Sequence, residues 1–391
     1  MNKLTLRTVP ALMLAAFSGV ASAAAFQLWE QNASGLGNAY AGSAAVAENA
    51  STVFFNPAGL TQLTGFQFSG GVTGVGPSYE FRNDGSTLSG NNGGDAGSWH
   101  AVPNLFLSGR LTDSLSLGFG VSAPFGLATE YDSGWVGRAQ TIKSEIRTVN
   151  FNPSVAYRIN DKVSIGFGVN YQKIDAELTN SVSRLKGDDS AWGWNAGALF
   201  TLSPAMRVGL SYRSSMKYTL EGTMNETIPV KADVELPDTA ILSVWQQVSD
   251  RWEAMGDLSY TRWSTLRSLN VVSRNSGATL GTEQFNYDNS WRIAWGAAYK
   301  ASDAAKLKFG IAYDRTPVKD ADRSARVPDN SRLWLSVGGQ WNAGRYGKFD
   351  LGYSYLYVKD SDINMTKNTT LLRGSYDASA HIVGLQYSVG F

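Results

Sequence analysis

Histidine and cysteine, the side chains of His-base, thiolate and many metal sites, are nearly absent from this chain. Its 391 residues include only two histidines, His100 and His381, and no cysteine. A Ser–His hydrolase would need a nucleophile motif around a particular serine, and no such motif is visible. Without cysteine, neither disulfides nor thiolate chemistry is available. We therefore expect no catalytic residue, no metal and no cofactor, and predict that the protein is not an enzyme.

Binding of nucleotides or nucleic acid is also not indicated. The glycines of Gly35-Leu36-Gly37 follow no predicted strand and open no βαβ unit, so they do not form a dinucleotide fingerprint. The chain carries 34 basic and 33 acidic residues, a balance that gives no reason to expect nucleic acid or a strongly charged partner. The glycines are better suited to tight turns and close packing against a wall.

The N-terminal residues predict export. A basic start with Lys3 and Arg7, an apolar run over residues 9–20 and the small residues Ala21-Ser22-Ala23 form a signal peptide over residues 1–23. The apolar run is about a dozen residues, whereas a membrane-spanning helix needs roughly 20. Loss of Lys3 and Arg7 turns the formal charge of +1 into −1. The mature chain is expected to start at Ala24.

Most of the remaining chain alternates between apolar and polar residues. In the last segment Val383 and Leu385 share one face, whereas Gly384 and Gln386 share the other. Side chains on a strand alternate faces, and a barrel in lipid turns its apolar face outward. About fourteen such segments follow residue 65, with short turns alternating with longer polar stretches. We predict an all-β membrane protein, a 14-stranded antiparallel transmembrane β-barrel in the bacterial outer membrane, with a secreted all-β protein as the alternative.

The segment before the first strand has a different composition. Residues 26–60 are rich in Gly, Ala and Ser, carry no charge except Glu30 and Glu48, and end in Asn56-Pro57-Ala58. A segment of such small side chains cannot build a core of its own, so it suits a compact plug packed inside something larger. We predict a plug, or hatch, over residues 24–64 in the lumen of a barrel formed by residues 65–391.

This segment closely resembles the N-terminal hatch of the FadL family of outer-membrane transporters, which includes TodX-type proteins. The matching elements are Phe26-Gln27-Leu28, Gly35-Leu36-Gly37, Ala39-Tyr40, Gly42 and Asn56-Pro57-Ala58. The resemblance implies transport of long-chain fatty acids by pocket binding, hatch rearrangement and lateral exit through a kinked third strand. Uptake of neutral or aromatic hydrocarbons by the same route is one alternative, and a general diffusion porin is another.

Three groups of residues are candidates for this function. Phe26, Leu28 and Trp29 are the apolar residues nearest the mature N-terminus, and we expect them to touch the ligand or its pocket; ordinary packing against the barrel interior is the alternative. Gly35, Gly37, Asn56, Pro57 and Ala58 form the hatch motif, which is either a hinge or wall contact or a simple turn. The third group, Pro124, Phe125 and Gly126, predicts the lateral opening, because proline and glycine disrupt a strand.

The expected partners are a hydrophobic small molecule and outer-membrane lipid, with no nucleic acid. Resemblance to other outer-membrane proteins implies that the terminal Phe391 is read by the barrel-assembly machinery, and we expect a monomer. A basic side chain is expected to meet a ligand carboxylate, but the sequence does not choose among the candidates Arg147, Arg158, Arg213, Arg292 and Lys308. The predicted external stretches 181–190 and 223–230 are short and polar, and Asp175 and Glu177 favour a neutral ligand over an anion.

Overall fold

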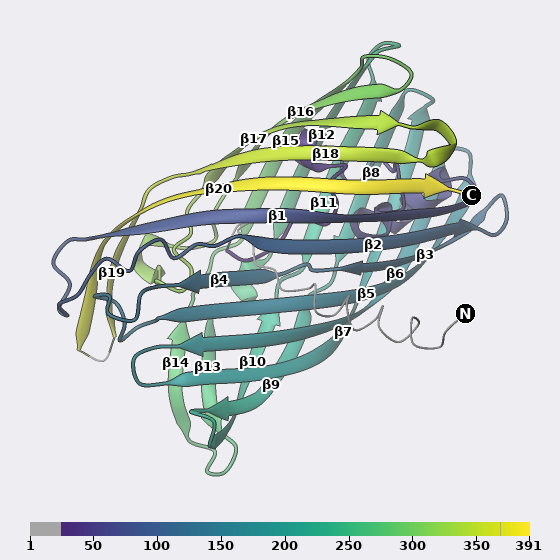
Figure 1. Cartoon of the computed structure of the whole chain (residues 1–391). Coiled ribbons are helices and arrows are strands. Elements are labelled where there is room, and N and C mark those ends of the chain that lie inside the picture. Colours follow the sequence, from purple (N-terminus) through teal and green to yellow (C-terminus); the bar gives the residue numbers. More distant parts are fainter. Residues whose placement is uncertain (1–24, 368) are drawn as a thin grey trace, which may run out of the picture.

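The computed structural model describes residues 25–367 and 369–391, so the predicted signal peptide lies outside the described residues. These residues form one closed antiparallel sheet in which β1 pairs with β20 (Figure 1). The strands are β1 (Phe66–Asn83), β2 (His100–Arg110), β3 (Leu115–Ser122), β4 (Gly126–Glu130), β5 (Lys143–Asn160), β6 (Val163–Thr179), β7 (Arg184–Ser203), β8 (Met206–Arg213), β9 (Met216–Met224), β10 (Ile228–Leu236), β11 (Thr239–Gln247), β12 (Trp252–Thr261), β13 (Ser268–Ser273), β14 (Thr279–Gln284), β15 (Ser290–Lys300), β16 (Ala305–Asp314), β17 (Arg332–Asn342), β18 (Lys348–Val358), β19 (Ser361–Lys367) and β20 (Thr370–Gly390).

The sheet is a barrel of 14 strands, which confirms the predicted fold. Several barrel strands are interrupted and therefore consist of two β segments each. These pairs are β3 with β4, β8 with β9, β10 with β11, β12 with β13, β14 with β15, and β18 with β19. No helix within residues 25–367 or 369–391 is long and apolar enough to cross a membrane.

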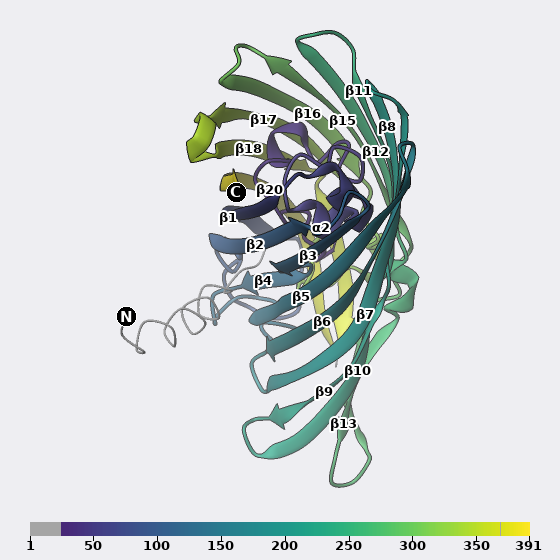
Figure 2. The same cartoon turned by 90° about the vertical axis from the view of Figure 1, so that its right-hand side faces the viewer.

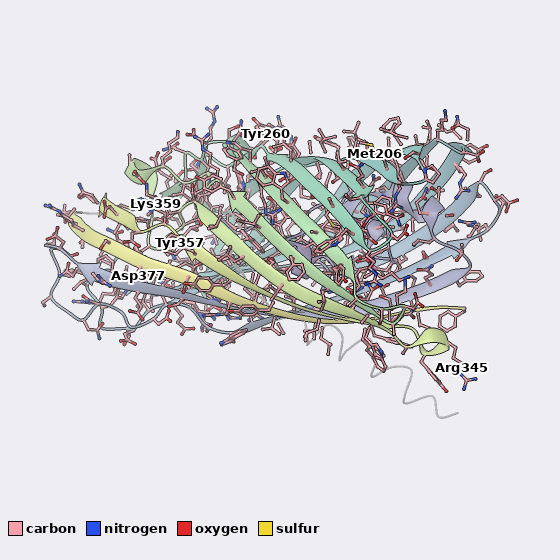
Figure 3. The ribbon with its side chains drawn as sticks, turned by 90° about the horizontal axis from the view of Figure 1, so that it is seen from above. Met206, Tyr260, Arg345, Tyr357, Lys359 and Asp377 are labelled. Atoms are coloured by element: carbon pink, nitrogen blue, oxygen red, sulfur yellow. The ribbon has the colours of Figure 1, made fainter. Side chains whose placement is uncertain are left out.

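The predicted alternation is visible in the wall. On β20, Val383 and Leu385 are exposed on the outer face, whereas Gly384 and Gln386 are buried toward the lumen. Tyr260 and Tyr357 are among the side chains that cover the outside of the barrel (Figure 3). Apolar side chains thus face the lipid and small or polar ones face the interior, as expected for a barrel in a membrane.

Residues 25–64 lie inside this wall (Figure 2). They contain three short helices, η1 (Leu36–Asn38), α2 (Thr52–Phe55) and η2 (Pro57–Gln62). Their backbone approaches inward-facing glycines of the wall so closely that a Cβ at Gly338 would lie 2.8 Å from the Cα of Gly37. A Cβ at Gly310 would lie 2.5 Å from the carbonyl oxygen of Asn38. Wall glycines therefore form the seat of the hatch, because no other residue leaves room for its backbone.

The external connections differ from the sequence-based prediction. β7 begins at Arg184 and β10 at Ile228, so most of the stretches predicted as loops at 181–190 and 223–230 continue the barrel strands. The remaining helices are η3 (Trp263–Thr265), η4 (Asp320–Asp322) and η5 (Gly344–Tyr346). A longer connection, residues 315–331, joins β16 to β17, and its residues Val318 and Val327 are buried in the interior.

Candidate functional site

An apolar cavity lies next to the start of the hatch. The free space among its lining atoms is about 560 Å³ including space open to solvent, and about 40 Å³ of it can hold the centre of a water molecule. The lining side chains come from the hatch, the barrel strands and the external connection 315–331. They are Phe26, Leu127, Ile146, Ile174, Ala176, Leu178, Leu220, Val234, Leu236, Leu266, Leu269, Phe285, Arg326 and Val327.

Phe26 is the hatch residue in this cavity. Its side chain is buried, and its ring packs edge-on against Trp263 with a centroid distance of 4.8 Å. The ring of Phe125, at the interruption of the third barrel strand, lies 6.3 Å away. Aromatic pairs in this geometry are favourable beyond their area burial. Phe26 thus joins the cavity to the place where the wall is interrupted.

Leu28 and Trp29 do not line the cavity. Both are buried in a separate cluster with the body of the hatch. The indole of Trp29 lies 4.8 Å from the Arg292 guanidinium, which also lies 4.9 Å from Trp334. Their packing corresponds to the alternative that the sequence left open for them, contact with the barrel interior.

The cavity contains one charged side chain, Arg326, which the sequence did not indicate. Its guanidinium donates to Thr141 Oγ1 and Ser144 Oγ, both at 3.0 Å, and its Nε lies 3.5 Å from Glu283. Burial lowers the pKa of Arg326 from its ordinary value. The bonds attach the connection 315–331 to the wall, so Arg326 closes one side of the cavity. Only the fold reveals this, because its partners lie up to 185 residues away in the sequence.

The third barrel strand is interrupted between Ser122 and Gly126. β4 pairs with β5 only, and residues 100–104 of β2 pair with β1 only, among the described residues. Pro124 and Gly126 lie at the position where the sequence predicted a kink. A backbone break in a membrane wall needs partners for its amide groups.

The start of the hatch supplies those partners. We call residues 25–31 the strap. Leu28 N donates to Pro124 O at 2.8 Å, and Gly126 N donates to Phe26 O at 2.9 Å. The Gln31 side chain both donates to Ala123 O (2.8 Å) and accepts from Ala123 N (3.1 Å). The strap thus takes the place of a neighbouring strand along the break.

Glu30 is the buried charge of the strap. Its side chain is fully buried, and no side chain of the described residues hydrogen-bonds its carboxylate. Burial raises the pKa of Glu30 from 4.5 to about 7, although the backbone N–H groups of Glu30 and Trp29 and the nearby Arg332 and Arg292 act in the opposite direction. The strap is therefore held by backbone hydrogen bonds and apolar packing, and it carries a carboxyl group that favours the protonated form.

The hatch motif lies against the wall. The Asn56 side chain accepts from Ala58 N (3.0 Å), which caps η2, and donates to Ala198 O of β7 (3.0 Å). Pro57 is the first residue of η2, where its missing N–H costs nothing. Gly37 meets Gly338 of the wall, whereas Gly35 packs against Tyr40 within the hatch. The motif therefore makes the wall contact that was one of its two interpretations.

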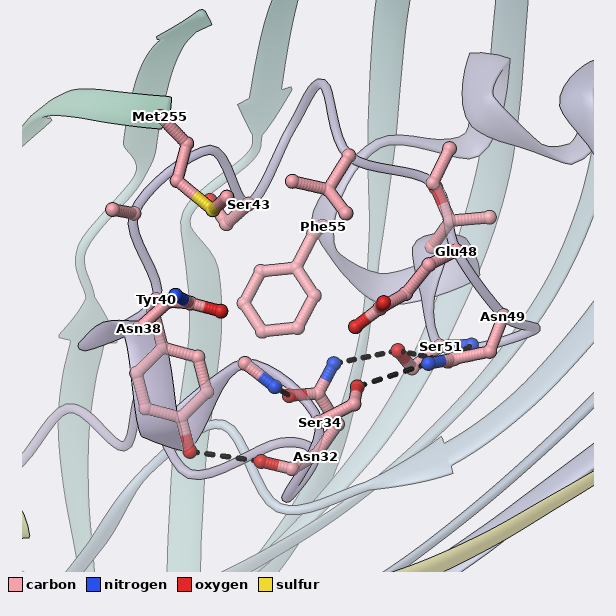
Figure 4. Close-up of a pocket in the computed structure, with 15 residues that line it drawn as sticks. Asn32, Ser34, Asn38, Tyr40, Ser43, Glu48, Asn49, Ser51, Phe55 and Met255 are labelled. Atoms are coloured by element: carbon pink, nitrogen blue, oxygen red, sulfur yellow. Dashed lines mark hydrogen bonds between the residues drawn. The ribbon is translucent and has the colours of Figure 1, made fainter. Parts of the chain in front are cut away.

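The body of the hatch is held by an internal hydrogen-bond network around a small polar pocket (Figure 4). Asn32 donates to Ser51 Oγ (2.6 Å), and Asn49 donates to Ser34 Oγ (2.9 Å). The Tyr40 hydroxyl donates to the Asn32 carbonyl at 2.9 Å. These bonds and the glycine seat fix the body of the hatch.

Most of the basic candidates fasten the hatch and do not reach the cavity. Arg158 donates to Thr61 O, Arg213 to Phe54 O and Arg292 to Ala39 O. Lys308 donates to Glu48 and Asp350, at 2.8 and 3.0 Å.

Arg147 pairs with Glu145 and does not line the cavity either. His381 of β20 lies on the exposed face beside Tyr353, 2.9 Å from its hydroxyl. His100 of β2 contacts the exposed Ser98, two residues away, and lies across β1 from His381, since the two histidines pair with the neighbouring residues Val75 and Gly76.

Comparison with known proteins decides the family. Residues 14–391 match the model of the outer membrane protein transport family (OMPP1/FadL/TodX). The chain belongs to this family. It is 32% identical to outer membrane protein P1 of Haemophilus influenzae, covering 97% of this chain and 98% of that protein. It is 29% identical to the long-chain fatty acid transport protein of Escherichia coli, over the full length of both.

Solved structures agree with the fold. A Pseudomonas aeruginosa FadL homologue superposes with a TM-score of 0.89 at 22% identity, covering 94% of this chain and all of that one. The Pseudomonas putida toluene transporter TodX gives a TM-score of 0.68 at 19% identity, with 94% and 100% coverage. The protein is thus an outer-membrane barrel of the FadL family, as predicted. At these sequence identities the two structures support only the fold.

Proposed function

We propose that this protein carries hydrophobic molecules across the outer membrane, with long-chain fatty acids as its ligands. The observation that carries the proposal is the apolar cavity, which is closed on one side by Phe26 of the strap. Burial of a ligand chain contributes ~0.8 kcal/mol per methylene group. Relatives that are 29% identical over at least 93% of this chain are named long-chain fatty acid transport proteins. A hatch seated in the lumen argues against an open diffusion porin.

The outer part of the barrel supports capture of such a ligand. A second apolar hollow of about 370 Å³ lies between β6, β7, β9, β10 and β13, and it shares lining residues with the cavity. The shared residues are Ala176, Leu178, Leu220 and Leu269. The two hollows adjoin each other across these side chains, on the way to Phe26. In this proposal the extended barrel strands line the entry of the ligand.

The interrupted strand supports lateral release. Rearrangement of the strap would break its hydrogen bonds with Ala123, Pro124 and Gly126 and move Phe26 at the same time. Ligand binding and opening of the wall are then coupled through one segment. In this proposal the ligand displaces Phe26 and leaves sideways through the break into the membrane.

The lining of the cavity suits an alkyl chain, but it does not identify a site for the carboxylate. Arg326 is the charged lining residue, but its donors are directed to the wall and to Glu283. Uptake of neutral or aromatic hydrocarbons by the same route is the second candidate, and it is favoured by the ion pair that already occupies this guanidinium. Phe391, whose side chain is exposed at the barrel end, is proposed as the recognition residue for barrel assembly, and the protein is proposed to act as a monomer.

Uptake by cells tests the proposal. Cells that produce the protein should accumulate labelled oleate or toluene faster than cells that lack it. A Gly126→Trp variant should fold, bind ligand and yet block uptake, because the indole would fill the break. Equal uptake with and without the protein would refute transport, and a Gly126→Trp variant that transports at the full rate would refute lateral exit.

A further inference from the structure

Two polar side chains at the inner margin of the break have no partner. Asn104 of β2 is 5% exposed, and neither atom of its amide group has a hydrogen bond among the described residues. Ser122, the last residue of β3, is fully buried, and its hydroxyl is likewise unpaired there. Buried polar groups nearly always find partners, so such a pair calls for an explanation.

The strand register places these two side chains on the same side of the wall. Phe106 of β2 pairs with Gly120 of β3, and both face the hatch, since a Cβ at Gly120 would lie 2.8 Å from the Phe106 ring. Asn104 and Ser122 are the next residues with the same orientation, one on each strand. The β2–β3 ladder ends at Leu105–Val121, immediately before them. They therefore stand at the point where the break begins.

We propose that Asn104 and Ser122 bind the polar head of a fatty acid as it leaves through the break. This inference rests on the proposed lateral exit. Between them the two side chains offer three N–H or O–H donors, and a carboxylate accepts through two oxygens. Hydrogen bonds to a charged acceptor are about twice as strong as neutral ones. A carboxylate that crosses an apolar opening without such donors would meet a high desolvation barrier.

The neighbouring groups suit an amphipathic ligand. Outward-facing residues at this level, Leu105 and Val121, are apolar and face the lipid. Asn150, the strand partner of Ser122, has an unpaired Oδ1 among the described residues, which can accept from the hydroxyl of a protonated acid. The alkyl chain can thus enter the membrane while the head stays on the polar inner side. A neutral hydrocarbon gains nothing from this arrangement.

A split between binding and uptake tests the assignment. The variant Asn104→Leu/Ser122→Ala should bind oleate with an unchanged Kd, because the cavity at Phe26 is intact. Its oleate uptake should fall about tenfold, the effect of losing one hydrogen bond to a charged group. Ser122→Thr, which keeps the hydroxyl, should transport like the parent. Ser108→Ala is the matched control, since Ser108 of β2 is also buried and unpaired among the described residues but lies within the intact ladder.

The outcomes separate this proposal from the one on which it rests. Unchanged oleate uptake by the double variant would overturn the headgroup site, as would an equal loss in Ser108→Ala or an equal loss of methyl oleate uptake. Full-rate transport by Gly126→Trp would instead overturn lateral exit itself. If the double variant does not assemble into a heat-modifiable barrel, Ser122→Ala is compared with Ser122→Thr by the same two measurements.

Discussion

Replacement of Gly310 by alanine should displace the hatch. Gly310 faces the lumen on β16, and an added Cβ would lie 2.5 Å from the Asn38 carbonyl oxygen and closer still to the adjoining peptide atoms. Ordinary contact begins near 3.4 Å, so the hatch backbone would have to move by about 1 Å. Because backbone atoms cannot rotate away as a side chain does, we expect a cost of ~1–3 kcal/mol, as for other overpacked sites.

Thermal unfolding in detergent and single-channel conductance in planar bilayers measure this effect. Gly310→Ala should unfold at a lower temperature and conduct more ions, because a displaced hatch no longer fills the lumen. Gly256→Ala of β12 is the matched control, since its added Cβ meets nothing closer than 3.6 Å. If Gly310→Ala and Gly256→Ala are indistinguishable in both measurements, the wall glycines are not the seat of the hatch.

Two further predictions concern the strap. Phe26→Ala should weaken oleate binding about tenfold, or ~1.4 kcal/mol, through loss of buried ring surface, while the barrel stays heat-modifiable. Phe55→Ala in the hatch body is the control. Equal oleate affinity of Phe26→Ala and the parent would contradict a role of Phe26 in ligand binding. Because the folded pKa of Glu30 is raised from 4.5 to about 7, the protonated carboxyl stabilises the fold at low pH, and about 3 kcal/mol should be lost as the pH rises from 4.5 to 7. Thermal unfolding from pH 4 to 8 should show this loss in the parent and a flatter profile in Glu30→Gln. Parallel profiles would contradict it.

The sequence alone determined the barrel and the hatch. Strict alternation along segments such as residues 382–391 indicates strands with one apolar face, and the number of such segments predicted the 14 barrel strands. A segment as poor in large side chains as residues 26–60 could be stable only inside another structure. Pro124 and Gly126 also marked the interrupted strand, because proline cannot donate a ladder hydrogen bond. These are local properties of the chain.

Only the tertiary structure decided the contacts between residues that are far apart in the sequence. Phe26, Leu28 and Trp29 look alike in the sequence, yet only Phe26 reaches the cavity, because the strap runs from the cavity at Phe26 to the body of the hatch at Leu28 and Trp29. Arg326 meets partners more than 180 residues away.

The unpaired state of Asn104 and Ser122 likewise depends on where two strands stop pairing. Composition and period describe each segment by itself. The positions of the segments relative to one another follow from barrel closure and from the close fit of the hatch to the wall glycines.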